Sequence, residues 1–121
     1  RQNRISRINY KMVSKNESAV EVTDKEFNDI VNNSHKLVIV DFFAEWCMPC
    51  LMIAPIIDEL AVKMKDVKFV RINVDDNEEL SGKYEIRSIP CLVFFKKGKE
   101  IYRIIGNRPE EEIEATIKKH L

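Results

Sequence analysis

Apolar residues are arranged along the chain in two ways, and each arrangement predicts one kind of element. Segments rich in apolar and β-branched residues predict strands over residues 19–22, 37–43, 67–74, 92–95 and 100–105, and the run over residues 37–43 is nearly continuous. Apolar residues three and four positions apart predict helices over about residues 23–34, 53–64 and 78–84 and from residue 109 onward. The predicted order is therefore β-α-β-α-β-α-β-β-α. Such alternation implies parallel crossovers, closed here by an antiparallel hairpin.

Capping and turn residues support several of these boundaries. Thr23 and Glu26 have the spacing of a capping box at a helix start. Residues 96–99 (KKGK) predict the turn of the hairpin, and Pro109 predicts the start of the last helix. Pro55 lies inside the second long helical pattern, so we expect it to kink that helix.

Composition predicts one domain with a basic segment before it. The chain has 121 residues, with 20 basic and 20 acidic side chains. Residues 1–16 hold five bases and no acid, so we expect residues 1–18 to be a flexible basic extension and residues 19–121 to be the domain. Residues 1–11 are then either vector-derived or the remainder of a targeting peptide. The balanced charge argues against nucleic acid as a partner, and the apolar runs are too short to cross a membrane.

A C-x-x-C motif lies between the strand predicted at residues 37–43 and the helix that follows. A thiol at a helix N-terminus is stabilised as a thiolate by the unpaired backbone N–H groups, which favours Cys47 as a nucleophile. Cys50 lies one turn further on, so the two sulfurs can close a small disulfide ring. Pro49 offers no N–H group, which should leave Cys47 only moderately acidic and the pair more reducing.

Half of a zinc site is the alternative interpretation of this motif. Structural zinc takes four ligands, usually two such pairs or added histidines. The further candidates, Cys91, His35 and His120, have no matching spacing. A C-x-x-C beside a βαβ pattern is typical of redox chemistry, so we expect no metal site.

Several segments resemble the thioredoxin family. Residues 41–50 (DFFAEWCMPC) resemble its active-site segment, and residues 52–55 (MIAP) continue the likeness. Ile89 and Pro90 resemble its cis-proline loop, and Gly106 matches a later glycine. The resemblance runs in unbroken order over residues 19–121. It implies the thioredoxin fold, an α/β fold in which a central mixed sheet of about five strands is flanked by about four helices in three α/β/α layers.

The resemblance implies a role for each matched residue. Cys47 would be the exposed attacking cysteine, Cys50 the buried resolving one, and Asp41 the buried carboxylate that takes the proton from Cys50. A carboxylate inside an apolar strand is costly to bury unless it is paired or used, which favours a function for Asp41. The implied substrate surface consists of Trp46, Met48, Ile89, Pro90 in the cis form, and Gly106.

Departures from the family pattern surround this site. Met48 replaces a glycine between the cysteines, and Leu51 stands where a basic residue is common. Arg71 replaces a lysine near the buried carboxylate, and arginine does not give up its proton. Ser88 replaces a frequent glycine in the substrate loop. Pro49 and Pro55 keep to the family pattern and are expected to be structural neighbours of the site.

Cys91 departs furthest, because it follows the cis-proline where threonine is usual. One interpretation is a packed, inert thiol, since free cysteine is among the most buried residue types. The other is a third sulfur close to the redox pair, able to join a regulatory disulfide or to share a metal or cluster.

The implied function is reduction of disulfides in client proteins, with electrons held on Cys47 and Cys50 and no bound cofactor. The implied partners are a thioredoxin reductase and disulfide-containing clients, and the implied state is a cytoplasmic monomer. An organellar location follows instead if residues 1–11 are the remainder of a targeting peptide. A thiol oxidant or isomerase, a metal or cluster carrier, and an interaction module with incidental thiols remain alternatives.

Overall fold

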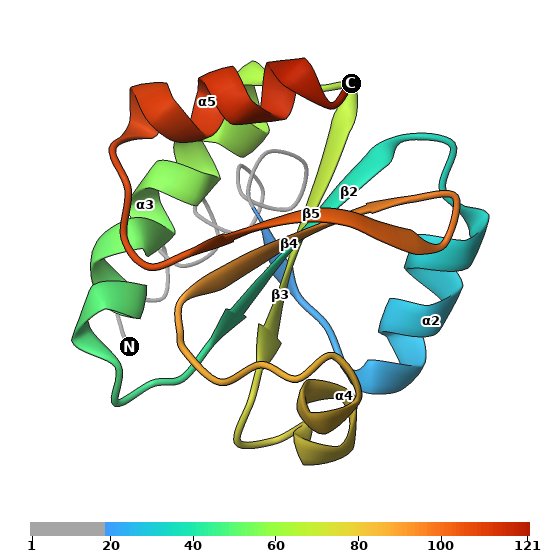
Figure 1. The fold of residues 1–121 in the computed structure, drawn as a ribbon, viewed down its shortest axis with the longest axis vertical. Helices are drawn as coiled ribbons and strands as arrows, with labels where there is room; N and C mark the ends of the chain where they lie inside the picture. The colour runs from blue at the N-terminus through green and yellow to red at the C-terminus, as the bar shows by residue number, and fades with distance from the viewer. Residues whose placement is uncertain (1–18) are drawn as a thin grey trace, which may run out of the picture.

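The computed structural model describes residues 19–121, so the basic extension predicted over residues 1–18 lies outside the described residues (Figure 1). One five-stranded sheet has the order β1-β3-β2-β4-β5. β1, β3 and β2 run parallel, whereas β4 is antiparallel to both β2 and β5. This confirms the predicted mixed sheet with a closing hairpin. The strands are β1 (Val20–Glu21), β2 (Leu37–Phe43), β3 (Val67–Asn73), β4 (Cys91–Lys96) and β5 (Lys99–Ile105).

Helices cover both faces of the sheet. They are α2 (Asp24–Asn33), α3 (Met48–Lys63), α4 (Glu78–Lys83) and α5 (Glu110–Lys119). Figure 1 shows α3 and α5 on one side of the strands and α2 and α4 on the other. The apolar core is divided in the same way: one buried cluster includes residues of α3 and α5, and the other includes residues of α2 and α4. This is the predicted three-layer α/β/α arrangement.

The predicted capping signals act where the sequence places them. The Thr23 hydroxyl accepts from the Glu26 N–H at 3.4 Å, and the Glu26 carboxylate accepts from the Thr23 N–H at 2.9 Å. Pro109 is the N-cap of α5, and α3 continues through Pro55 to Lys63. No helix among residues 19–121 combines the length and the apolar character needed to span a membrane.

The central strand β2 positions the site. All seven of its residues are buried, as expected for a strand covered on both faces. Side chains alternate between the faces of a strand. Leu37 and Ile39 belong to the cluster under α3 and α5, whereas Val40 and Phe42 belong to the cluster under α2 and α4. Asp41 therefore faces the layer of α3 and α5.

Candidate active site

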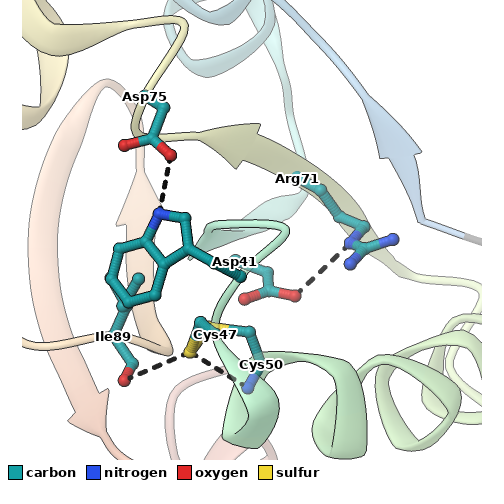
Figure 2. The surroundings of a disulfide bond; sticks show 7 residues. Asp41, Cys47, Cys50, Arg71, Asp75 and Ile89 are labelled. Atoms are coloured by element: carbon teal, nitrogen blue, oxygen red, sulfur yellow. Dashed lines mark hydrogen bonds and ion pairs between the residues drawn. A yellow bond between two sulfur atoms is a disulfide. The ribbon is translucent and has the colours of Figure 1, made fainter.

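The two cysteines lie where β2 gives way to α3, beyond the carboxyl end of the central strand. Cys47 is the N-cap of α3, and its Sγ accepts the Cys50 N–H at 3.3 Å. The two residues are joined by a disulfide, with their Cα atoms 5.2 Å apart. Figure 2 shows this pair with Cys47 Sγ directed toward the carbonyl oxygen of Ile89, 3.8 Å away. The helix N-terminus predicted for the motif is confirmed.

Cys47 is far less exposed than the resemblance implies. Its residue exposure is 4%, compared with 0% for Cys50. The expectation of an exposed attacking cysteine is therefore wrong in degree. One contact is local, because the side chain caps its own helix, and the other is long-range, because Ile89, from a loop 42 positions further along the chain, lies against the sulfur. Only the order of exposure, with Cys47 above Cys50, agrees with expectation.

Trp46 lies at the surface beside the disulfide. It is 72% exposed, and its indole N–H donates to Asp75 Oδ2 at 2.8 Å. Sequence reasoning missed Asp75, which follows β3. The available signal was its position, because the carboxyl ends of parallel β2 and β3 meet at the same edge of the sheet. The hydrogen bond orients this largely exposed side chain.

Asp41 is a fully buried acid. Its exposure is 0%, and neither carboxylate oxygen has a hydrogen-bond partner among residues 19–121. Arg71 lies opposite it on β3, with Nε 3.5 Å from Asp41 Oδ2, so the two form an ion pair without hydrogen-bond geometry (Figure 2). Burial raises the pKa of Asp41 to about 6, and the positive charge of Arg71 limits the rise.

Arg71 is held in place by a second contact. Its guanidinium lies 4.3 Å from the centre of the Phe43 ring, and its side chain is 20% exposed. A guanidinium over an aromatic face is attracted by the ring quadrupole. The predicted proximity of Arg71 to Asp41 is thus confirmed, and the cation remains partly hydrated while the carboxylate is not.

The Ile89–Pro90 peptide bond is cis, and the Ile89 carbonyl oxygen lies 3.8 Å from Cys47 Sγ. The Gly106 N–H donates to the Pro90 carbonyl oxygen at 2.8 Å, which ties the end of β5 to this loop. Gly106 has φ of +91°, and no atom lies within 4 Å of the place a Cβ would occupy. Met48 is 63% exposed on the first turn of α3. The structure therefore gathers these predicted substrate-surface residues around Cys47.

Cys91 lies on the other face of the sheet. It is 1% exposed and in register with Phe42, and both belong to the cluster under α2 and α4. Burial raises the pKa of the Cys91 thiol. Its side chain therefore points away from the layer of α3, whose first turn carries Cys50. Of the two interpretations of Cys91, the packed thiol fits this position.

No group of three or more His, Cys, Asp or Glu side chains among residues 19–121 is arranged to hold a metal ion. The arrangement suits disulfide exchange: a redox pair at a helix N-terminus, a buried acid with a raised pKa on the same side of the sheet, and a loop edge beside the outer sulfur.

Comparison with known proteins agrees with this geometry. The family model described as Thioredoxin matches residues 18–119. The chain belongs to the thioredoxin family. Thioredoxin 1 of a Nostoc species is 41% identical over 105 residues, which covers 86% of this chain and 98% of that protein. Thioredoxin of Bacillus subtilis is 42% identical over 103 residues, covering 84% and 97%.

Solved structures show the same family likeness. Thioredoxin of Fasciola hepatica superposes with a TM-score of 0.78 at 39% identity, covering 85% of this chain and 99% of that one. A mutant thioredoxin from Halobacterium salinarum gives a TM-score of 0.79 at 30% identity, covering 86% and 91%. Like its thioredoxin relatives, the chain is a dithiol–disulfide oxidoreductase whose redox centre is the Cys47–Cys50 pair.

Proposed function

We propose that Cys47 attacks client disulfides and that Cys50 resolves the mixed disulfide. The observation that carries this division is the position of each sulfur. Cys47 Sγ borders the Ile89 loop at the start of α3, whereas Cys50 is 0% exposed and lies one turn inside the helix. Cys47, at 4%, retains the only exposure of the pair, so a protein client approaches Cys47 and Cys50 is reached by its neighbour.

The chemistry balances as two thiol–disulfide exchanges. The Cys47 thiolate attacks one sulfur of the client disulfide, a mixed disulfide forms, and the other client sulfur leaves as a thiolate. The Cys50 thiolate then attacks Cys47 Sγ, the Cys47–Cys50 disulfide forms, and the second client sulfur leaves. The client gains two electrons, and the pair loses two.

Asp41 is the proposed acceptor of the Cys50 proton. Because its pKa is about 6, Asp41 is mostly ionised at neutral pH and can therefore accept a proton. The pKa is also close enough to neutral pH for the carboxylate to be an effective base. Arg71 carries a permanent charge, so its proposed role is to keep the carboxylate ionised rather than to exchange protons. Apart from the ion pair with Arg71, neither oxygen of Asp41 accepts a hydrogen bond among residues 19–121, which supports this role because a purely structural acid would be expected to have hydrogen bonds.

Clients are proposed to lie over Trp46, Met48, Ile89, Pro90 and Gly106, which surround Cys47. Ile89 and Gly106 would offer backbone groups to an extended segment, and the open space over Gly106 supports close approach. Pro49 and Pro55 would shape α3 beneath this surface.

A reductase must return the two electrons, and we propose that it is a thioredoxin reductase. We further propose that this chain is a monomer and binds no organic cofactor. A chain of a solved structure described as "Structural basis of the thiol resolving mechanism in yeast mitochondrial 1-Cys peroxiredoxin via glutathione/thioredoxin systems" superposes with a TM-score of 0.77 at 30% identity, covering 86% of this chain and 97% of that one. This likeness supports protein clients. A reducing compartment such as the cytoplasm suits the proposed activity. Residues 19–121 would form the catalytic unit. Residues 1–18 lie outside this unit, and an organellar location is proposed instead if residues 1–11 are the remainder of a targeting peptide.

The test is reduction of insulin disulfides by dithiothreitol with the wild type, Cys47→Ser and Cys50→Ser. We expect turnover by the wild type and background rates for both variants. In the presence of client proteins, Cys50→Ser should accumulate stable mixed disulfides, because nothing resolves them, and Cys47→Ser should not. Equal trapping by the two variants would overturn the assignment.

A further inference from the structure

An uncharged stretch surrounds the redox pair. Charged residues make up 33% of the chain, yet residues 46–57 contain none. Four large apolar side chains of this stretch are exposed, and we call them the apolar rim: Trp46 at 72%, Met48 at 63%, Leu51 at 48% and Met52 at 58%. Exposed apolar side chains gathered in one patch are typical of protein-binding surfaces.

The rim is a continuous feature of the first turns of α3. Met48, Leu51 and Met52 are three and four positions apart, so they share one face of the helix. The other face of the same turns is buried through Cys50 and Ile53. Because these turns are apolar on both faces, their exposed face is suited to packing against a partner.

A client is the molecule that covers this face. Exchange requires the client sulfur to come within bonding distance of Cys47 Sγ, and the rim borders Cys47 on both sides in the sequence. The polypeptide around the client disulfide must therefore lie on Trp46 and on the first turn of α3. The rim is continuous with the reacting sulfur and needs no separate ligand.

The charges at the edge of the rim indicate which clients fit. Glu45 precedes Trp46 and is exposed, and Asp75 accepts the Trp46 indole N–H. Leu51 supplies no positive charge at the opposite end. An acidic client segment would meet two carboxylates beside Trp46 and would have to desolvate its own charges against apolar side chains.

We propose that the apolar rim selects client segments whose disulfide is flanked by apolar, uncharged residues, with Met48 and Leu51 as specificity-determining residues. The proposal rests on the proposed attack by Cys47. The two methionines adapt to many apolar shapes, because the side chain is unbranched and flexible. Selection is therefore by polarity, and one rim accepts many sequences.

The test compares two cyclic peptides that differ only beside the disulfide, one with leucines and the other with glutamates. The measured quantity is the ratio of kcat/KM for the leucine peptide to kcat/KM for the glutamate peptide. A change in the reactivity of Cys47 affects both peptides and cancels in this ratio. Bis(2-hydroxyethyl) disulfide, which is small and neutral, reports separately whether the wild type performs exchange and whether Cys47→Ser abolishes it.

We expect a wild-type ratio of about tenfold or more, from burial of apolar surface against the rim. Leu51→Gln should lower the ratio about threefold, because it removes apolar contact without adding charge. Leu51→Lys should lower it about tenfold, because the ammonium also attracts the glutamates. Met48→Gln should lower it by about as much as Leu51→Gln.

Val62→Lys is the matched control. Val62 is 44% exposed on the same helix, eleven positions from Leu51 and therefore roughly 16 Å along its axis. Its substitution should leave the ratio unchanged. A wild-type ratio near one, or an equal fall in Val62→Lys and Leu51→Lys, would overturn the proposal. Failure of Cys47→Ser to abolish reduction of the small disulfide would instead overturn the proposed function.

Discussion

Asp41 and Cys91 are buried to nearly the same degree on neighbouring strands, yet their surroundings differ. Asp41 is 0% exposed on the face under α3, with no hydrogen bond to either oxygen among residues 19–121. Cys91 is 1% exposed on the opposite face, in an apolar cluster. That cluster includes Phe27 and Phe95, whose rings meet edge to face at 5.3 Å. Burial alone therefore does not separate the proposed proton acceptor from the packed thiol.

The difference lies in what burial does to each group. A neutral thiol loses little on transfer into an apolar core, and its van der Waals contacts repay the transfer. A carboxylate loses its hydration, and Arg71 replaces only part of it. The face under α2 and α4 contributes stability at this position, whereas the face under α3 loses stability to hold a group that can accept a proton.

Among these substitutions, replacing Asp41 should change the free energy of unfolding most. Asp41→Asn removes a buried charge, so we expect it to raise the free energy of unfolding of the oxidised protein by about 3 kcal/mol at neutral pH. Guanidinium chloride unfolding of the wild type and the variant measures this. A lower unfolding midpoint for the variant would contradict it.

The pH dependence of stability tests whether ionised Asp41 lowers the free energy of unfolding. Because the pKa of Asp41 is raised from 3.8 to about 6, the folded state binds more protons than the unfolded state between these values. The contribution of Asp41 to the free energy of unfolding should therefore fall as pH rises through that window and then level off. The difference between Asp41→Asn and wild type isolates it: the stability gained by the variant should grow from pH 4 to pH 6 and remain constant above.

Replacing Arg71 should have a smaller effect, which acts through the pKa of Asp41. Arg71→Gln removes the charge that opposes desolvation, so the pKa of Asp41 should rise further above 6. The pH at which the variant's stability levels off should move upward by the same amount. Arg71→Lys, which keeps a positive charge, is the matched control and should move it less. An unchanged levelling point in Arg71→Gln would show that the ion pair does not set this pKa.

Replacing Cys91 should have the smallest effect. Cys91→Thr keeps a similar volume on the face away from the redox pair, so insulin reduction should be unchanged, and burial of the hydroxyl should lower stability by about 1 kcal/mol. Wild type and variant should also lose activity to peroxide at equal rates. Faster inactivation of the wild type, with Cys91 found in a disulfide, would show that Cys91 takes part in the redox chemistry and would contradict the packed-thiol interpretation.

Local patterns in the sequence were enough to predict the element order, the capping box and the site at the end of β2. They work because periodicity, caps and a C-x-x-C at a helix start are short-range properties. The resemblance added the proximity of Asp41 and Arg71, which the register of β2 with β3 confirms.

Features that depend on contacts between residues distant in the sequence could not be predicted from local patterns. The low exposure of Cys47 depends on Ile89, and the orientation of Trp46 depends on Asp75, 29 positions away. The side of the sheet on which Cys91 lies follows from the pairing of Cys91 with Phe42. A shift of one residue in that register would reverse it, and nothing near Cys91 in the sequence fixes the register.

The rate of resolution tests the proposed role of Asp41 most directly. A mixed disulfide between Cys47 and a chromogenic thiol can be formed in the wild type and in Asp41→Asn, and release of the thiol can be followed from pH 4 to pH 8. We predict that wild-type release slows as pH falls through about 6, where Asp41 becomes protonated. Asp41→Asn should be slower at neutral pH and lack that inflection. Equal rates and equal pH profiles would contradict a proton-accepting role for Asp41.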